Sequence, residues 1–190
     1  MGKPFSNGNK KCLQLNMHSF SEIQKFSIRW AWLGTIALNG LFIYAIIEQI
    51  VLGKPFGNKP APDAVLIAVE LFFLLLLLFI MSIRLKTNFN GEGIQYRFYP
   101  FQLKTTAIEW HELSDAYIRE YNSLFEYGGW GIRQGAPKTG RAINTSASCN
   151  KGLQLRFRDG KLLLIGTKNP AAIQKILDEV IIAGKINRII

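Results

Sequence analysis

The sequence predicts a membrane α-helical hairpin followed by an α+β, mostly β, soluble domain that ends in one α-helix. Three observations support this fold class. Two long apolar runs lie in the first half of the chain, period-2 alternation begins near Arg84, and an amphipathic segment follows Asn169. The hydrophobic content of 48% and the net charge of +10 are compatible if the apolar residues are concentrated in spans.

The stronger span is Val65–Ile83, 19 residues in which Glu70 is the only charge. A helix of this length is roughly 28 Å long, close to the roughly 30 Å hydrocarbon core of a bilayer. It is apolar on every face, which is not typical of a surface helix, and the rest of the chain is too short to wrap it. Trp30–Leu52 is the other span. The Pro- and Gly-rich segment 53–64 is a turn, so the spans form an antiparallel hairpin.

Three polar side chains lie inside these spans. Asn39 is near mid-membrane, where we expect it to hydrogen-bond to the other helix. Glu48 and Glu70 both lie roughly 6–8 Å inside the outer boundary, counted from the span ends. Intramembrane acids indicate proton or cation handling. The alternative is that these shallow carboxylates reach headgroup water or share a proton across the hairpin.

The segment before the hairpin is polar and basic. We expect residues 1–18 to form a disordered tail. Ser19 and Glu22 fit a capping box, which predicts that Phe20–Arg29 is an interfacial helical turn running into the first span. The hairpin segment is therefore 19–83. Cations flank one side of it more than the other, namely Lys25, Arg29, Arg84, Lys86 and Arg97 against Lys54 and Lys59. This asymmetry predicts that both termini are cytoplasmic.

Residues 84–184 predict about seven short antiparallel strands and one helix, with 185–190 as a tail. Asn90–Gly93 indicates a hairpin turn, and Asp159-Gly160 predicts a type I′ turn. Gly128 and Gly129 predict a bulge or bend in a strand. Asn169 and Pro170 indicate a helix start, and Gly184 a helix end.

Four stretches carry a resemblance to a known family: Tyr127–Arg133, Asn150–Leu155, Asp159–Lys161 and Leu164–Pro170. The sequence resembles the bacterial pleckstrin-homology-like (PH-like) membrane proteins, in which a transmembrane hairpin precedes a cytosolic PH-like domain. The match is good over 125–177 and weaker over 85–124. It implies a bent β-sandwich or barrel capped by the C-terminal helix, and a place in the bacterial inner membrane. The family is largely of unknown function, so the resemblance implies no catalytic residues.

The candidate binding residues are in the glycine-rich stretch, namely Tyr127, Gly128, Gly129, Trp130 and Arg133. A bulge at the glycines would turn Trp130 outward beside Arg133, and Trp and Arg are the types most enriched at binding hot spots. The alternative is that the bend is structural and Trp130 lies in the core. The run lacks the spacing of a phosphate-binding loop.

Other chemistry has little support in the sequence. His18, His111, Cys12 and Cys149 lack metal-ligand spacing, so we expect no metal and no cofactor. His111, Ser114 and Asp115 lie on one short stretch without a nucleophile elbow, which argues against an enzyme.

The region from Arg84 to Ile190 has 16 Lys and Arg against 9 Asp and Glu, yet shows no nucleic-acid-binding module. An anionic leaflet suits this charge, with an evenly solvated surface as the alternative. We therefore expect a membrane-anchored binding or assembly module, with membrane lipids and a protein partner. The alternative is an accessory subunit of a transport complex that uses Glu48 and Glu70, and an enzyme is the third possibility.

Overall fold

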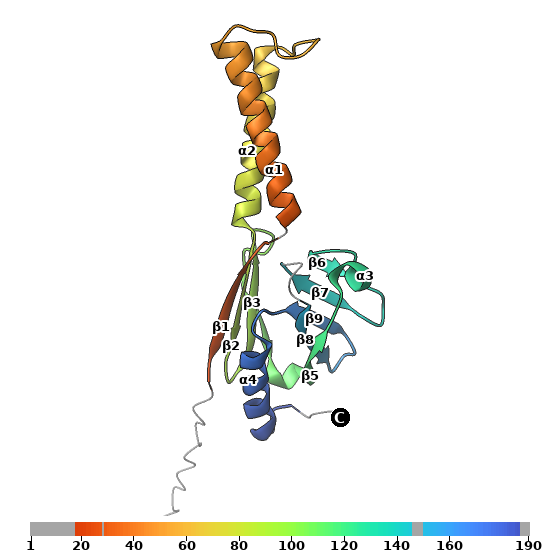
Figure 1. Cartoon of the computed structure of the whole chain (residues 1–190). Coiled ribbons are helices and arrows are strands. Elements are labelled where there is room, and N and C mark those ends of the chain that lie inside the picture. The colour runs from red at the N-terminus through yellow and green to blue at the C-terminus, as the bar shows by residue number, and fades with distance from the viewer. Residues whose placement is uncertain (1–17, 28, 146–149, 187–190) are drawn as a thin grey trace, which may run out of the picture.

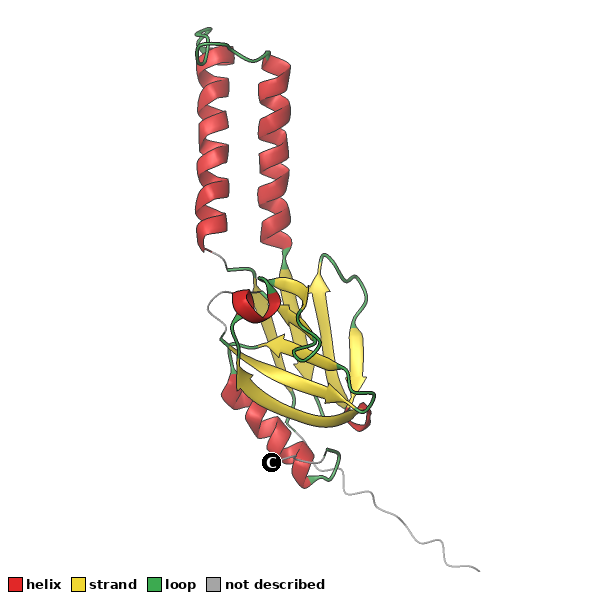
Figure 2. Cartoon of the chain, turned by 90° about the vertical axis from the view of Figure 1, so that its right-hand side faces the viewer, coloured by secondary structure: helices red, strands yellow, loops and turns green. Residues whose placement is uncertain are grey.

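The computed structural model describes residues 18–27, 29–145 and 150–186. Two long helices stand side by side at one end of a two-sheet β domain, and the C-terminal helix lies at the opposite end (Figures 1 and 2). The predicted tails, 1–18 and 185–190, lie largely outside the described residues.

The two long helices are α1 (Arg29–Ile46), continued by a π-helical turn η1 (Ile47–Val51), and α2 (Asp63–Ser82). Both are long and apolar enough to cross a membrane, by length and composition. Few of their side chains are buried inside the molecule, so they are not core helices of the domain. The side-chain nitrogen of Asn39 donates to the carbonyl of Thr35 on its own helix at 2.7 Å, and it also lies 3.5 Å from the carbonyl of Phe73 across the pair.

The hairpin is inserted between two neighbouring strands of one sheet. β1 (Phe20–Lys25) comes before α1 and pairs antiparallel with β2 (Arg84–Phe89), which follows α2. Lys25 lies opposite Arg84, and the next backbone amide, of Phe26, donates to the carbonyl of Ile83 at 3.2 Å. Both ends of the hairpin are therefore attached to the same sheet, and the domain begins before the first helix.

The helical turn predicted for Phe20–Arg29 is wrong over β1. The side chains that β1 turns inward are polar, Glu22 and Gln24, while Ile23 points outward and is 59% exposed. The strand therefore lacks the apolar alternation that identifies a half-buried strand in a sequence. Its apolar residues, Phe20, Ile23 and Phe26, happen to follow helical spacing instead.

The first sheet has the order β1-β2-β3-β4, with β3 (Gly93–Tyr99) and β4 (Thr106–Glu109). A 3-10 turn, η2 (Trp110–Glu112), leads into the second sheet, whose order is β5-β8-β9-β7-β6. Its strands are β5 (Leu113–Glu120), β6 (Gly131–Gln134), β7 (Arg141–Asn144), β8 (Lys151–Phe157) and β9 (Leu162–Gly166). Among the described residues no strand pairing joins the two sheets, so the domain is an open sandwich rather than a closed barrel.

The core lies between the sheets and under the C-terminal helix α4 (Pro170–Ile182), which contacts β1, β5 and β8. The helix buries the face predicted from its sequence, namely Ile173, Ile176, Leu177 and Val180. It begins after Asn169 with Pro170 in the first turn, and Gly184 with φ 68° follows its end, as predicted. The Asn169 side chain, however, makes no capping hydrogen bond.

Both predicted strand hairpins are present, but the turn between β8 and β9 is not type I′. A type I′ turn needs positive φ at Asp159, whereas only Gly160 has one, at 84°. The amide of Gly160 donates to the carbonyl of Phe157 at 3.0 Å, so a type I turn is followed by a left-handed glycine. The Asp159 carboxylate accepts the amide of Lys161, which stabilises this longer turn.

Candidate functional site

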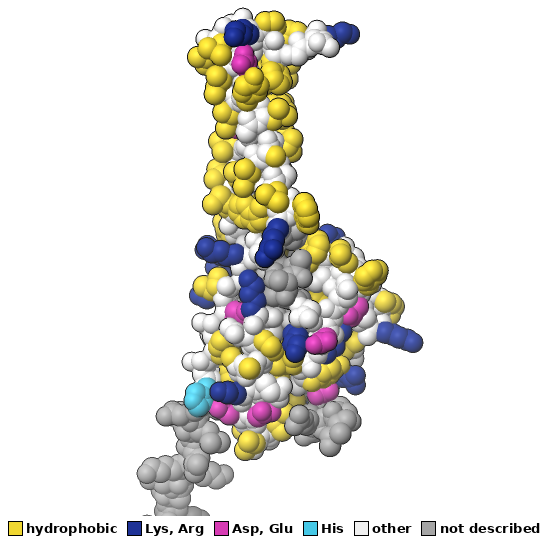
Figure 3. Space-filling view, in the orientation of Figure 1, with side chains coloured by type: hydrophobic (Ala, Val, Ile, Leu, Met, Phe, Trp, Pro, Cys, Tyr) yellow, Lys and Arg dark blue, Asp and Glu magenta, His cyan; other side chains and the backbone are white. Residues whose placement is uncertain are grey.

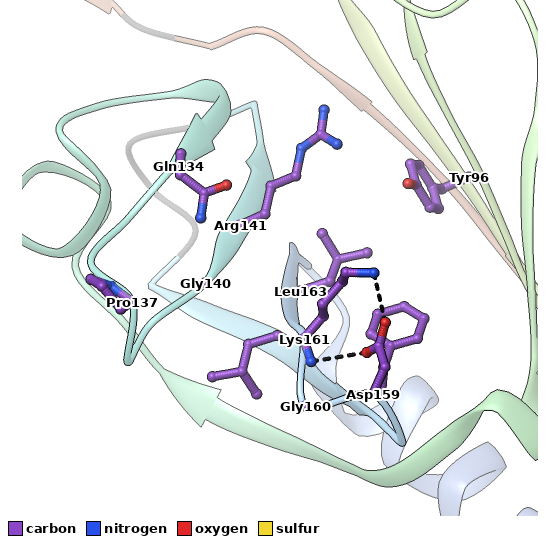
Figure 4. A pocket seen from close by; sticks show the side chains of 11 residues that line it. Tyr96, Gln134, Pro137, Gly140, Arg141, Asp159, Gly160, Lys161 and Leu163 are labelled. Carbon is purple, nitrogen blue, oxygen red and sulfur yellow. Dashed lines mark hydrogen bonds and ion pairs between the residues drawn. The ribbon is translucent and has the colours of Figure 1, made fainter.

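A cleft of about 700 Å³ opens between the two sheets (Figure 4). Its apolar lining includes Tyr96 from β3, Phe157 from the end of β8 and Leu163 from β9. Its polar lining comes from Gln134, Arg141, Asp159 and Lys161. The cleft exists because the first sheet and the β6-β7-β9 side of the second sheet are not joined by strand pairing.

Arg141 is the uncompensated charge of this cleft. Its side chain projects from β7 into the space between the sheets, toward Tyr96 (Figure 4). Lys161, by contrast, is neutralised by Asp159, whose carboxylate lies 2.6 Å from the Lys161 ammonium. The hydrogen bond from Lys161 lowers the pKa of Asp159 and raises that of Lys161. Among the described ion pairs none includes Arg141, so the cleft combines apolar walls with one free cation.

The loop between β6 and β7 forms one wall of the cleft and is held in place by close contacts. Gly140 has φ 71°, and a Cβ there would lie 2.4 Å from the carbonyl oxygen of Leu162. Only glycine fits this position. The hydroxyl of Tyr127, from α3, donates to the carbonyl of Thr139 at 3.2 Å, which restrains the loop. The cleft is therefore preformed on this side.

The glycine-rich stretch does not form the bulged strand that its sequence predicted. Ser123–Tyr127 is a short helix, α3, and its N-terminus is capped by the Asn122 side chain, which accepts two backbone amides. Gly128, with φ 67°, is the left-handed residue that ends this helix. The glycines thus terminate a helix, and β6 begins only at Gly131.

The five predicted binding residues are divided by this arrangement. Tyr127 is 4% exposed, and its hydroxyl accepts from the Arg119 guanidinium at 2.8 Å. Burial raises the pKa of that hydroxyl. Arg133 is exposed, and its Nε donates to the carbonyl of Trp130 at 3.0 Å. Trp130 is half-buried, and Gly128 is exposed while Gly129 is buried. A binding role for Trp130 and Arg133 stays a prediction.

The two acids in the helical hairpin do not contact each other. Glu48 accepts a hydrogen bond from Tyr44 at 3.1 Å, on its own helix, and one carboxylate oxygen of Glu70 is enclosed without a partner. The side chain of Gln49 donates to Asp63 at 2.6 Å, which fixes the pairing of the helices near the turn. Counted from this pairing, Glu70 is level with Phe42, which is about 9 Å along the helix from Glu48.

The remaining candidates are dispersed. His111 lies 3.1 Å from Glu109, Ser114 donates to the carbonyl of Arg156, and Asp115 is buried. Within the described ranges no three His, Cys, Asp or Glu side chains gather as metal ligands. No protein-family model matches this chain, and no curated protein matches it either.

Sequence reasoning singled out Asp159–Lys161 as a turn but did not identify the cleft or its residues Arg141 and Tyr96. Arg141 and Tyr96 come from different sheets and 45 positions apart in the chain, and neither lies in a motif. Their proximity depends on how the two sheets pack, and no local sequence pattern carries that information.

Proposed function

We propose that this chain is a membrane-anchored binding module, with a PH-like domain on the cytoplasmic side of a bacterial inner membrane. In this proposal the hairpin α1–α2 spans the bilayer and the domain presents the cleft to a protein partner. The observation that carries the proposal is Arg141, an exposed cation in none of the described ion pairs, which projects into a preformed cleft with apolar and polar walls.

Two features support the membrane position. The helices expose apolar side chains along their length, such as Leu71 and Phe72, which are 53% and 61% exposed. Such a surface is stable in lipid and not in water. Lys and Arg side chains gather where the apolar helical hairpin meets the β domain (Figure 3). That distribution favours a cytoplasmic domain.

The chemistry of the cleft suggests the kind of partner segment that it takes. Tyr96, Phe157 and Leu163 offer apolar contact, and Arg141 offers a planar fork of donors that matches a carboxylate. An extended segment with an apolar side chain next to an Asp, a Glu or a C-terminal carboxylate satisfies both. The partner would therefore be an acidic protein segment.

The test compares two arginines on the full-length protein in its membrane. A photoreactive amino acid at Gln134, in the cleft, should cross-link a partner in cells. Arg141→Glu should abolish the cross-link, because it replaces the free cation by a repulsive charge. Arg133→Glu has the same charge change outside the cleft and should leave the cross-link intact. Loss in the Arg133 variant alone would favour the Trp130–Arg133 surface and contradict the cleft.

Orientation has its own test. In a chain whose native cysteines are replaced by serine, a membrane-impermeant thiol reagent on intact cells should label Asn58→Cys, in the turn between the spans. It should spare Lys138→Cys, an exposed position beside the cleft. The reverse pattern would place the domain outside.

The alternative role, in transport, depends on Glu48 and Glu70 acting together. The two carboxylates do not contact each other, and Glu48 accepts a hydrogen bond from Tyr44 on its own helix. We expect Glu70→Gln to retain wild-type function at unchanged membrane levels. Loss of function at normal levels would favour the transport role instead.

A further inference from the structure

A second site lies outside the cleft, on the outer face of the first sheet beside the helical hairpin. Four cations there form what we call the basic face, namely Lys25, Arg84, Lys86 and Arg97. They come from three adjacent strands, and cross-strand neighbours share a face of a sheet. Lys25 lies opposite Arg84, which lies opposite Tyr99, and Ile23 lies opposite Lys86, which lies opposite Arg97.

This arrangement is unfavourable for an isolated domain. Two like-charged pairs, Lys25 with Arg84 and Lys86 with Arg97, are directly cross-strand, and such pairs destabilise a sheet. The described ion pairs include no carboxylate for any of the four residues. The Nε of Arg97 is enclosed and has no hydrogen-bond partner. The described residues therefore supply no carboxylate to balance the charge of the basic face.

The cations also surround a formed hollow. A pocket of about 340 Å³ is lined by Ile23, Arg84, Lys86, Arg97 and Tyr99. The guanidinium carbons of Arg84 and Arg97 lie 5.2 and 5.9 Å from the centre of the Tyr99 ring. Both guanidinium groups therefore lie within cation–π distance of one ring, which restricts where they can move before any ligand binds.

Its position identifies the source of the anion. Arg84 is two residues after Ser82, the last residue of α2, and Lys25 lies directly across from it. This row is therefore at the level where a helix leaves the hydrocarbon and meets lipid headgroups. The row of Lys86 and Arg97 lies two residues further along the strands, about 7 Å away. Ile23, which is 59% exposed, lies beside this second row.

We propose that the basic face binds the headgroup phosphate of an anionic phospholipid from the leaflet next to the domain. Arg84 and Arg97 hold the phosphate with paired N–H donors, Tyr99 positions them, and Lys25 and Lys86 supply further charge. The bound lipid offsets the repulsion between the two like-charged pairs. This site rests on the membrane position proposed above, but it is separate from the cleft and does not depend on the proposed protein partner.

The test uses the full-length protein in nanodiscs of phosphatidylcholine alone or of equal parts phosphatidylcholine and phosphatidylglycerol. The melting temperature of the wild type should be higher with phosphatidylglycerol, and native mass spectrometry should retain phosphatidylglycerol after detergent extraction. The variant Lys86→Gln/Arg97→Gln should lose this retention, with an affinity about 30-fold weaker for two lost cations. In phosphatidylcholine alone it should be as stable as wild type or more stable, because a repulsive pair is gone.

The matched control is Lys138→Gln/Arg156→Gln, which removes the same charge from exposed positions away from the basic face. It should keep the lipid. Equal loss in both variants would mean attraction by total charge and would overturn the site. Equal retention of phosphatidylcholine and phosphatidylglycerol by the wild type would also overturn it. A last outcome would assign the face to a soluble anion instead. In it, inorganic phosphate displaces the lipid, and glycerophosphate binds as tightly as phosphatidylglycerol.

Discussion

β1 and β2 lie side by side over six residue pairs, yet they are held in the sheet by different forces. β2 turns Leu85 and Phe89 inward, and both are fully buried in the core. β1 turns Glu22 and Gln24 inward, which are 8% and 1% exposed. One strand is stabilised by apolar burial, whereas the other places buried polar groups that need hydrogen-bond partners.

β1 finds these partners at the end of β9 and in the segment between β9 and α4. The Glu22 carboxylate accepts from the hydroxyl of Thr167 at 2.8 Å and from the amide of Lys168 at 2.9 Å. The Gln24 side chain donates to the carbonyl of Gly166 at 2.7 Å. Since these bonds are directional, a shift of β1 by one residue would break them and bury Ile23 in their place. Polar contacts thus fix the register of β1, while packing supplies the stability of β2.

The largest effect should come from removing β1 entirely. A chain that begins at Arg84 keeps α4 and eight strands but exposes the edge of β2 and leaves Thr167 and Gly166 without β1. We expect it to lack a cooperative unfolding transition, measured by circular dichroism. A folded, cooperative domain from this chain would show that β1 is dispensable.

The matched variant keeps β1 and replaces residues 27–82 by Asn-Gly. Because Phe26 and Ile83 are already hydrogen-bonded partners, a two-residue type I′ turn can close this hairpin. We expect a soluble, cooperatively folded domain. Both shortened chains lack the membrane helices, but only the first lacks β1. A difference in folding between them is therefore due to the strand.

Within the full chain, the next largest effect should come from the inner face of β2. Phe89→Ala removes a fully buried ring that stacks near Phe20, and it should cost about 3–5 kcal/mol of the free energy of unfolding. Denaturant unfolding in nanodiscs measures this cost. A loss below about 1 kcal/mol would mean that the interior around β2 closes over the missing ring.

The inner face of β1 should be less sensitive. Gln24→Ala leaves the carbonyl of Gly166 and the hydroxyl of Thr145 without this partner, and should cost about 1–3 kcal/mol. Ser21→Ala, at an exposed position on the same strand, should change stability by less than about 0.5 kcal/mol. If the two substitutions changed the free energy of unfolding equally, the side-chain hydrogen bonds of Gln24 would not be what stabilises β1.

The smallest effect concerns the start of β1. Both the backbone amide and the ring of His18 hydrogen-bond to Glu179 of α4, and the backbone bond is the main reason that the pKa of Glu179 is lowered. A lowered carboxyl pKa stabilises the fold above about pH 4.5, and this contribution disappears as pH falls through the folded pKa. Glu179→Gln should therefore be slightly less stable than wild type at pH 7 and equal to it in acid. Asp178→Asn, the adjacent exposed acid, should show no such convergence.

The sequence predicted an element correctly where a single kind of pattern is enough to identify that element. Composition alone identifies the two apolar helices, and apolar period 3.6 identifies the buried face of α4. Leu153–Phe157 also carries clear alternation, and a turn signal separates it from the apolar run Leu162–Gly166. β1 carries the opposite pattern, with polar residues inside, because its partners are hydrogen-bonding groups rather than a hydrophobic core. The cleft was not predictable, because it depends on how far the two sheets diverge around Arg141 and Tyr96.

The insertion of the hairpin between β1 and β2 sets an order of events during synthesis. The ribosome makes β1 first, but its neighbour β2 emerges only after both helices, and Thr145 and Gly166–Lys168 emerge later still. If only one helix entered the bilayer as a span, β1 and β2 would be on opposite sides of the membrane and could not pair. The first sheet can therefore fold only after both helices have inserted correctly. A wrongly inserted chain stays unfolded and is exposed to proteolysis.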